Sequence, residues 1–345
     1  MSGRLEITGC GVLSAAGIGM EALLSALTAD EPDSAPAGDF SVPDFDVRTF
    51  LGRKGTAFLD RSTALALVAC GQALEDGGLR IDAGNRERVG VVLGTSVGSL
   101  RSMSDYTRET LVEDRPYLVN PALFPNTVMN CAAGQSAIRY GLAGVNATVA
   151  GGELAFLSVL RYAAGALRRG DVAALLAGAV EELSPHRSRA VQLVPDGPPA
   201  GAGEAAAVFV VEAAGSGRPA DAEVLAVTAG FDPDGDSGAL RDRLFAALEA
   251  AGADPARVSL AAGAEAADGL EAVAVELGIG EVRRFPWRTR LGACQAAAAG
   301  LQVATLVALH RQAAANGGRL WALAGREPDG AVAAAVLRVH GRRAA

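Results

Sequence analysis

Cysteine and histidine are the side chains of this sequence that could attack an acyl group or move a proton, and both are scarce. The cysteines lie far apart and form no CxxC pair; they are Cys10, Cys70, Cys131 and Cys294. This spacing supports no zinc or redox site, so we interpret them as small buried apolar residues. The histidines are His186, His310 and His340. We interpret His310, deep in an apolar helical segment, as a helix-face residue. The sequence predicts no metal site and no cofactor.

A glycine-rich turn, Gly94–Gly98, follows an apolar segment and invites comparison with a phosphate-binding loop. Its spacing is not GxGxxG, and a P-loop needs a lysine, whereas Lys54 is the single lysine of the chain. The segment GVNATVAGGEL at 144–154 follows no phosphate pattern either. We therefore expect no nucleotide binding.

Apolar strands alternate with helical patterns along the chain, which is typical of an α/β fold with helices on both faces of a sheet. Strands are predicted at Leu5–Val12, Val89–Leu93, Val145–Val149, Val172–Ala177, Ala205–Glu212, Glu223–Ala229, Val258–Ala261, Val282–Phe285, Leu320–Ala324 and Ala331–Val339. Helices are predicted at Met20–Ala29, Arg61–Gly77, Asn126–Tyr140, Gly152–Arg168, Ala239–Ala251, Gly269–Leu277 and Ala293–Asn316, and a loop at 31–56. The alternation restarts after GSGRPADA (215–222), which predicts two similar halves, 1–215 and 216–345.

The amino-acid composition and the net charge limit the kinds of partner that we expect. Half of the 345 residues are hydrophobic and a fifth are charged, enough for a large core. The net charge of −8 argues against a nucleic-acid partner but leaves an acidic carrier protein open, because local patches can override the sum. The opening MSGRLEITGCGVLSAAG has no basic region followed by an apolar run, and no apolar stretch reaches the roughly 20 residues of a membrane span. We expect a cytoplasmic protein.

Three segments stand out in order along the chain: the opening RLEITGCGVLSAAG, FPNTVMNCAAGQSAIRYGLAGVNATV (124–149) and LRRGDVAALLAGAVEEL (167–183). Together they resemble the β-ketoacyl synthases, the condensing enzymes of fatty-acid and polyketide synthesis. This resemblance implies a thiolase-like fold, with two pseudo-repeated βαβαβ halves in a layered α-β-α-β-α architecture.

The residues that do the chemistry in that family are replaced here. The family uses a cysteine at a helix N-terminus to hold the acyl chain, and two histidines and a lysine for decarboxylative condensation. A phenylalanine gates the pocket. The matching positions are Ala150 for the cysteine, Ala262 for the first histidine, Ala293 for the second, Arg288 for the lysine and Arg326 for the gate. In a second register, which matches Asp268 and Glu271 to the family's acidic pair, Leu260 replaces the first histidine.

The resemblance implies a chain-length-factor-like subunit that forms a heterodimer with an active ketosynthase and shapes a shared acyl tunnel. The product would be a polyketide or a reduced polyene, with an acyl carrier protein reached through the complex. The implied tunnel residues are Met103, Tyr106, Thr107, Thr110 and Leu111. The implied dimer interface holds Asn130, Gln135, Val145, Asn146, Ala147, Thr148 and Val149, and arginines that could meet a carrier are Arg168, Arg169, Arg187 and Arg189.

Three alternatives stay open from the sequence. Met103 and Leu111 could be plain core residues rather than tunnel residues. The chain could be a decarboxylase or acyltransferase, although Glu153, Thr148 and Asn146 are the polar groups near the lost cysteine and none is an evident base. It could also be an acyl-binding homodimer with no catalytic partner.

Overall fold

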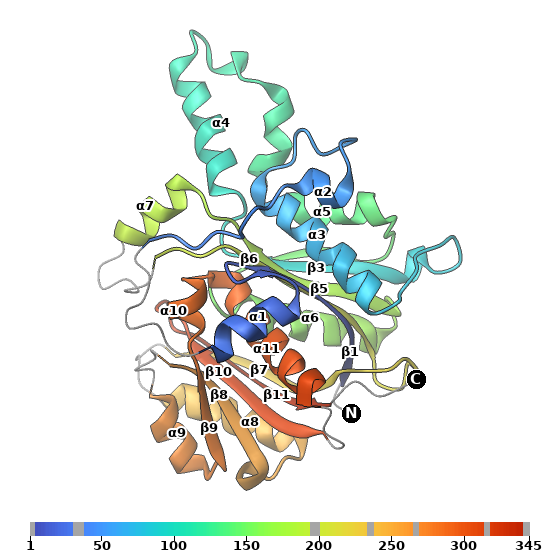
Figure 1. Ribbon diagram of the computed structural model, residues 1–345, viewed down its shortest axis with the longest axis vertical. Helices are drawn as coiled ribbons and strands as arrows, with labels where there is room; N and C mark the ends of the chain where they lie inside the picture. Colours follow the sequence, from blue (N-terminus) through green and yellow to red (C-terminus); the bar gives the residue numbers. More distant parts are fainter. Residues whose placement is uncertain are drawn as a thin grey trace.

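Strands and helices alternate along the whole chain in the computed structural model, which describes residues 4–29, 38–193, 201–232, 238–264, 269–313 and 318–340 (Figure 1). The strands are β1 Leu5–Ser14, β2 Gly17–Ile18, β3 Val89–Thr95, β4 Asn146–Ala150, β5 Ala174–Glu181, β6 Ala205–Ala213, β7 Ala222–Phe231, β8 Val258–Gly263, β9 Glu281–Phe285, β10 Arg319–Arg326 and β11 Ala331–Val339. The α-helices are α1 Met20–Thr28, α2 Val47–Leu51, α3 Arg61–Asp76, α4 Leu100–Val112, α5 Cys131–Tyr140, α6 Ala155–Arg169, α7 Pro185–Leu193, α8 Gly238–Ala251, α9 Leu270–Leu277, α10 Trp287–Leu291 and α11 Ala298–Ala313. Short 3-10 helices include η2 Pro116–Leu118, η3 Pro121–Thr127 and η5 Gln295–Ala297.

The strand order repeats between the two halves of the chain. The sheet runs β4-β3-β5-β6-β1-β7-β11-β10-β8-β9, and β2 pairs with β1. In the first half β4, β3 and β5 are parallel, and β6 and β1 continue antiparallel. The second half has the same pattern in mirror order, from β9 through β8, β10 and β11 to β7. The halves meet where β1 pairs antiparallel with β7. The predicted boundary at 215/216 falls between β6 and β7 and stays a prediction.

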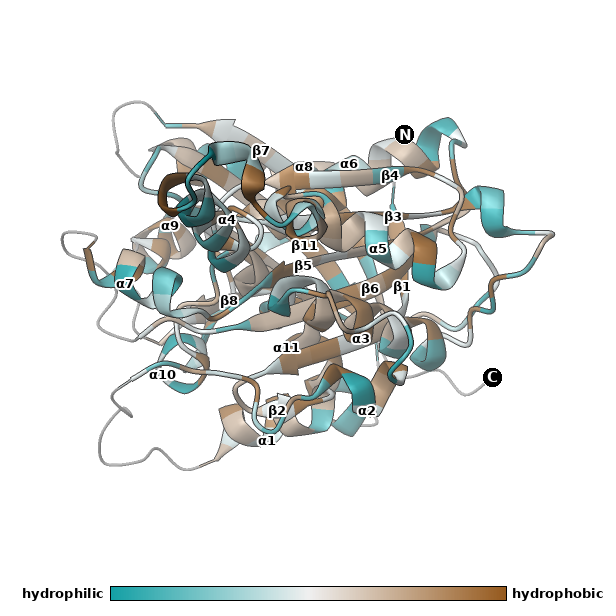
Figure 2. Ribbon diagram, turned by 90° about the horizontal axis from the view of Figure 1, so that it is seen from above, coloured by the Kyte–Doolittle hydropathy of each residue, from teal (hydrophilic) through white to brown (hydrophobic). Residues whose placement is uncertain are grey.

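The molecule has five layers (Figure 1). From top to bottom they are α3 and α5, the first half-sheet, the central helices, the second half-sheet, and α8 and α9. The central layer holds α6, which includes Phe156, and α11. Their apolar side chains pack with Phe209 of β6 and Trp321 of β10 in one cluster between the two half-sheets. Separate clusters join α3 and α5 to the first half-sheet and α8 and α9 to the second. Figure 2 shows the hydrophobic colouring along α11 and the strands around it. The thiolase-like layered fold expected from the sequence is therefore the observed one.

Close contact between α3 and β1 depends on two glycines. A Cβ at Gly9 would lie 2.3 Å from the carbonyl oxygen of Ala73, and one at Gly11 would lie 2.0 Å from that of Ala69. A side chain at either place would push the helix off the sheet. The glycines of the opening segment therefore set the distance between the outer helix and the central strand.

Three predicted helices begin at least three residues later than expected, and one of them is α6, which begins at Ala155 rather than Gly152. The helix predicted from Asn126 begins at Cys131, because Pro121–Thr127 forms a 3-10 helix and Val128 is extended. The helix predicted from Ala293 begins at Ala298, because the N–H of Ala293 donates to the Gly201 carbonyl and its own carbonyl accepts from Gly203. The predicted end of this helix at Asn316 lies outside the described residues. The predicted loop contains α2, and its residues 31–37 also lie outside them.

Helix α4, for which the sequence predicts no element, projects from the body together with η2 and η3 (Figure 1). The structure describes all thirteen residues of α4, and none of their side chains is buried. Tyr106 packs edge-on against Phe124 of η3, with 6.0 Å between the ring centroids. The projection is therefore stabilised by contacts among its own segments and by its attachment to the body.

One partly buried guanidinium joins four layers of the fold. Arg311 of α11 donates to both carboxylate oxygens of Asp76 at 2.9 and 2.6 Å and to both of Asp221 at 2.8 and 2.5 Å. Asp76 ends α3 and also accepts from the N–H of Cys10 in β1 at 2.9 Å. Asp221 immediately precedes β7. The outer helix, the central strand, the second half-sheet and the central helix therefore share this contact.

We expect Arg311→Met to destabilise the chain by about 3 kcal/mol or more, because it leaves two largely buried carboxylates without their cation. Urea unfolding monitored by circular dichroism measures the loss. The control Arg241→Met removes exposed pairs to Asp242 and Glu276 and should change stability far less, because solvent screens these charges. Equal losses in the two variants would contradict the central role of Arg311.

Candidate functional site

A cavity of about 430 Å³ opens where the two halves of the fold meet at the start of α6 and α11. Its walls come from β8, α10, β10, the segment before α11 and the segment 153–157. The residues on which the argument below depends are Glu153, Ala262, Arg288, Ala293, Cys294 and Arg326.

The positions that the resemblance matches to the family's catalytic groups lie in the wall of this cavity, with one exception. Ala262, Ala293 and Arg288 line it, and Arg326 lines it from the gating segment. Ala150 is not among the described lining residues; it ends β4 and is exposed. Leu260 is buried among the apolar side chains beneath α8 and α9, so of the two registers only that of Ala262 gives a residue of the cavity.

Of the two acids of the other register, the structure describes only Glu271, which is bound to Arg284 at 2.9 Å on the surface of the molecule. Asp268 lies outside the described residues.

An ion pair lies in the wall of the cavity. The Arg288 guanidinium donates to the Glu153 carboxylate at 2.5 Å, and each side chain is about one-third exposed. Glu153 is the acid nearest to Ala150 in the sequence. Its carboxylate and the Arg288 guanidinium therefore each have a partner within the chain.

A second carboxylate occupies the N-terminal end of α6. The N–H of Leu154, the cap residue of α6, donates to Glu327 Oε1 at 2.8 Å. A Cβ at Gly152 would lie 2.4 to 2.6 Å from this carboxylate, so the glycine leaves room for it. Helix N-termini attract anions. Burial raises the pKa of Glu327, the Leu154 hydrogen bond opposes the shift, and nearby Glu153 and Asp329 add to it.

Among the described lining residues, Cys294 is the one thiol. Its side chain is buried and donates to the Leu291 carbonyl at 3.3 Å. Burial raises the pKa of Cys294 to about 12, so the thiol stays protonated at neutral pH. His310 is buried elsewhere, where its Nε2 accepts from the indole of Trp321 at 3.0 Å. The cavity therefore offers neither a thiolate nor an imidazole.

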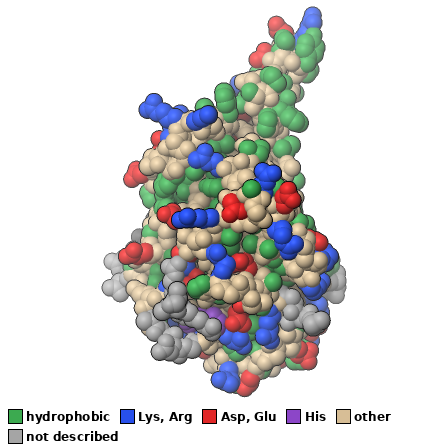
Figure 3. All heavy atoms as spheres, turned by 90° about the vertical axis from the view of Figure 1, so that its right-hand side faces the viewer, with side chains coloured by type: hydrophobic (Ala, Val, Ile, Leu, Met, Phe, Trp, Pro, Cys, Tyr) green, Lys and Arg blue, Asp and Glu red, His purple; other side chains and the backbone are tan. Residues whose placement is uncertain are grey.

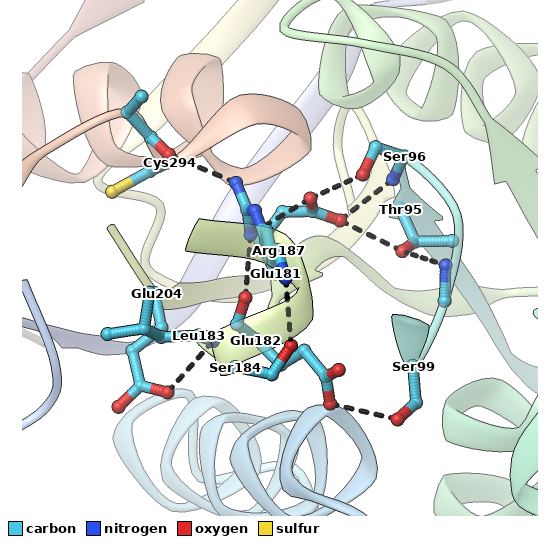
Figure 4. A network of polar contacts seen from close by, with 12 residues as sticks. Thr95, Ser96, Ser99, Glu181, Glu182, Leu183, Ser184, Arg187, Glu204 and Cys294 are labelled. Carbon is cyan, nitrogen blue, oxygen red and sulfur yellow. Dashed lines mark hydrogen bonds and ion pairs between the residues drawn. The ribbon is translucent and has the colours of Figure 1, made fainter. Parts of the chain in front are cut away.

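A network of buried charges lies beside the cavity and connects it to the base of α4 (Figure 4). Glu181 accepts from the Thr95 hydroxyl at 3.0 Å and from the N–H of Ser96 at 2.8 Å. Arg187 lies 3.1 Å from Glu181 and donates to the carbonyls of Glu182 and Ala293 at 2.8 and 3.0 Å. One arginine thus joins the end of β5 to the cavity wall.

The burial of two side chains, Arg187 and Cys131, differs from what the sequence predicts. Arg187 was a candidate for the rim, but it is buried because Glu181 and two carbonyls bind its guanidinium. Arg168, Arg169 and Arg189 are exposed. Cys131 is only partly buried, at the start of α5, whereas Cys10, Cys70 and Cys294 are buried as expected.

The implied tunnel residues lie together on the projecting helix α4. Met103 and Leu111 are exposed on α4, so the alternative that they are plain core residues is wrong. Tyr106 and Thr110 are partly exposed and Thr107 is exposed.

The implied interface lies next to this projection. Asn146 through Val149 lie in β4, at one end of the sheet order, and Asn130 and Gln135 lie at α5. Asn146 Nδ2 donates to the Ala133 carbonyl at 3.3 Å, which ties α5 to this edge strand. Val145 precedes β4 and its carbonyl accepts from Val91. The buried hydroxyl of Thr148 makes no hydrogen bond within the described residues.

Sequence reasoning missed Glu327 and the roles of Glu181, Glu182 and Arg187. The pair Glu181–Glu182 ends an apolar strand, and two adjacent acids there signal buried carboxylates that need partners. Glu327 gives no such signal, because its contact with Leu154 joins residues 173 positions apart.

Within the described part of the chain, no group of histidine, cysteine and acidic side chains could hold a metal ion. In the same residues, no helix is both long and apolar enough to cross a membrane.

Comparisons with known proteins agree on one family. The model of the β-ketoacyl synthase N-terminal domain matches residues 28–193. The chain is 32% identical over 192 residues to 3-oxoacyl-[acyl-carrier-protein] synthase 2 of Vibrio harveyi, covering 52% of this chain and 46% of that protein. It is 25% identical over 263 residues to the synthase 2 of Staphylococcus aureus, covering 68% of this chain and 63% of that one. The chain thus spans about half the length of the first of these relatives.

Solved structures match over nearly the whole chain. The ishigamide ketosynthase/chain length factor superposes with a TM-score of 0.84 at 35% identity, covering 98% of this chain and 100% of that one. A type II PKS acyl-carrier protein in complex with its ketosynthase, AntDE:AntF, gives a TM-score of 0.83 at 18% identity over 98% and 100% of the two chains. The second likeness shows the fold alone.

We expect Glu327→Gln to become increasingly stabilising, relative to the unchanged chain, as pH rises. The folded-state pKa of Glu327 is raised, so its ionisation costs no native stability below the unfolded-state pKa and costs most above the folded-state pKa. Glutamine keeps an oxygen that can accept from Leu154 and carries no charge. Chemical unfolding at about pH 4 and about pH 7 measures the difference.

The control for the loss of one carboxylate is Glu249→Gln, on an exposed position of α8. A difference between Glu327→Gln and the unchanged chain that is the same at both pH values would contradict the expectation.

Proposed function

Because the chain belongs to the β-ketoacyl synthase family, we propose that it is a non-catalytic, chain-length-factor-like subunit. In this proposal it forms a heterodimer with an active ketosynthase and shapes the tunnel that receives the growing acyl chain. The partner carries out the decarboxylative condensation of a type II polyketide or reduced polyene pathway.

The observation that carries the proposal is an intact cavity from which the condensing chemistry is missing. Ala262 and Ala293 line it as methyl groups, and Arg288 is held by Glu153. The Cys294 thiol is protonated at neutral pH because burial raises its pKa to about 12. The altered-chemistry alternative gains no support, because the cavity has no free base beside a nucleophile among the described residues.

The projecting surface supports a protein partner. Several large apolar side chains on and beside α4 are exposed, and Figure 3 shows hydrophobic atoms gathered along the projection. They are Met103, Leu111, Val112, Tyr117, Leu118, Phe124, Val128, Met129 and Ile138. An apolar patch of this extent typically marks a protein interface. Strand β4 lies at the adjacent end of the sheet, where a second strand could pair with it.

The names of the two structural neighbours agree with this choice of partner. One is a ketosynthase/chain length factor, and the other is a complex of an acyl-carrier protein with its ketosynthase. For this chain we propose a ketosynthase as the direct partner and an acyl carrier protein as a partner of the complex. The exposed Arg168, Arg169 and Arg189 remain candidates for a contact with an acidic carrier.

Co-expression with the ketosynthase encoded beside this chain tests the proposal. We expect a 1:1 complex by size-exclusion chromatography with mass determination, and malonyl-carrier condensation by the complex. Replacing the partner's catalytic cysteine by alanine should abolish that activity, since this chain supplies no nucleophile. A homodimer that binds no ketosynthase would contradict the proposal and favour the acyl-binding alternative. Thioester turnover by this chain without a partner would favour an altered enzyme.

A tunnel wall on α4 predicts shorter products when its side chains grow. We expect Thr107→Phe and Thr110→Phe to shift the partner's product toward fewer two-carbon units, because the larger rings fill the end of the tunnel. Mass spectrometry of the products measures the shift. The matched control Glu249→Phe, on the far outer layer of the fold, should leave the length unchanged. Unchanged products in both threonine variants would remove α4 from the tunnel.

A further inference from the structure

Helix α4 is attached to the body at its N-terminal end. None of its thirteen residues, all of them described, is buried, so its packing does little to fix its direction. Away from its base, its aromatic contact is Tyr106 on Phe124, and η3 belongs to the same projection. Beside the base, Asp105 lies 3.9 Å from the imidazole of His186 in α7, a long contact between side chains that are each about half exposed. The direction of α4 must therefore come mainly from the groups that bind its first turn.

The buried carboxylate of Glu182 binds that first turn with both oxygens. Ser99, the N-cap residue of α4, donates its hydroxyl to Glu182 Oε2 at 2.9 Å. The N–H of Arg101 donates to Glu182 Oε1 at 3.0 Å. Ser99 also accepts from the N–H of Ser102, so the anchor includes the local cap. Helix N-terminal N–H groups favour an anion, and a two-oxygen contact restricts tilt more than a single hydrogen bond does.

The backbone that carries Glu182 is itself fixed. Its carbonyl accepts from Arg187 at 2.8 Å, and the same guanidinium binds Glu181 and the carbonyl of Ala293 in the cavity wall. Glu181 in turn holds Ser96 in the turn before α4 (Figure 4). Both ends of the contact between Glu182 and α4 are therefore supported by buried groups of the main body.

We infer that Glu182 is a positioning residue for product length: it sets the direction of α4 and, through α4, the depth of the shared tunnel. This inference rests on the proposed function, because only in the complex would α4 face an acyl chain. A helix of this length spans about 20 Å, so a tilt of about 10° at the base moves its far end by about 3 Å. That displacement is comparable to one two-carbon unit. Glu182 itself would touch no substrate.

Hydrogen–deuterium exchange on the full-length chain tests the anchor without any partner. We expect Glu182→Ala to speed exchange in 100–112 about fivefold, as the loss of a helix cap does, and to leave β3 and β5 unchanged. Glu182→Gln should restore most of the protection, because its amide oxygen can accept one of the two hydrogen bonds. Unchanged exchange in α4 would overturn the inference, and so would equally faster exchange throughout the chain.

Product analysis of the complex tests the consequence. We expect Glu182→Ala to broaden or shift the product lengths while the yield of complex stays within about twofold, and Glu182→Gln to return them toward the original length. Glu249→Ala is the control for the loss of a carboxylate. Product lengths that stay the same although hydrogen exchange in α4 is faster would overturn the inference. If Thr107→Phe shifts the lengths in that case, the proposed function stands; if it does not, the proposed tunnel fails as well.

Discussion

The fold depends on one arginine placed between two carboxylates in a largely buried region. Arg311 binds Asp76 and Asp221 with paired hydrogen bonds, a geometry that repays the cost of removing three charges from water only when every partner is present. These acids belong to the outer helix of the first half and to the entry of the second half. The central helix α11 is thereby fixed, near its C-terminal end, to the outer helix and to both half-sheets.

Several charged and backbone groups at the cavity bind other parts of the same chain. Arg288 binds an acid of its own chain, and Ala293 uses both backbone groups to join the segment 201–203. Arg187 reads as a surface cation in the sequence, yet it connects β5, α7 and the cavity wall. Buried charges of this kind are costly unless fully paired. Their pairing stabilises the walls of the cavity.

The sequence predicts the strands well because a strand buried on both faces needs a continuous apolar run, as in β3 and β5. The positions matched to the family's catalytic residues follow from ordered motifs and stay a prediction; Ala262, Ala293 and Arg288 line one cavity, whereas Ala150 does not. The sequence does not predict where α5 and α11 begin, since Val128 and Ala293 are removed from the helices by local backbone geometry and by a distant segment. Glu327 and Arg187 escape prediction for the same reason: their partners lie far away in the chain, and no periodic pattern records such a contact.

The carboxylate at the start of α6 also bears on any attempt to give this chain a nucleophile. The family's cysteine is matched to Ala150, four residues before Leu154, whose N–H donates to Glu327 Oε1 at 2.8 Å. A cysteine introduced at Ala150 would therefore approach a helix end that already binds a carboxylate, and a nearby anion raises the pKa of a thiol. Under the proposed function, a chain redesigned for condensation would need a change at Glu327 and an opened Arg288–Glu153 pair as well as a cysteine and two histidines.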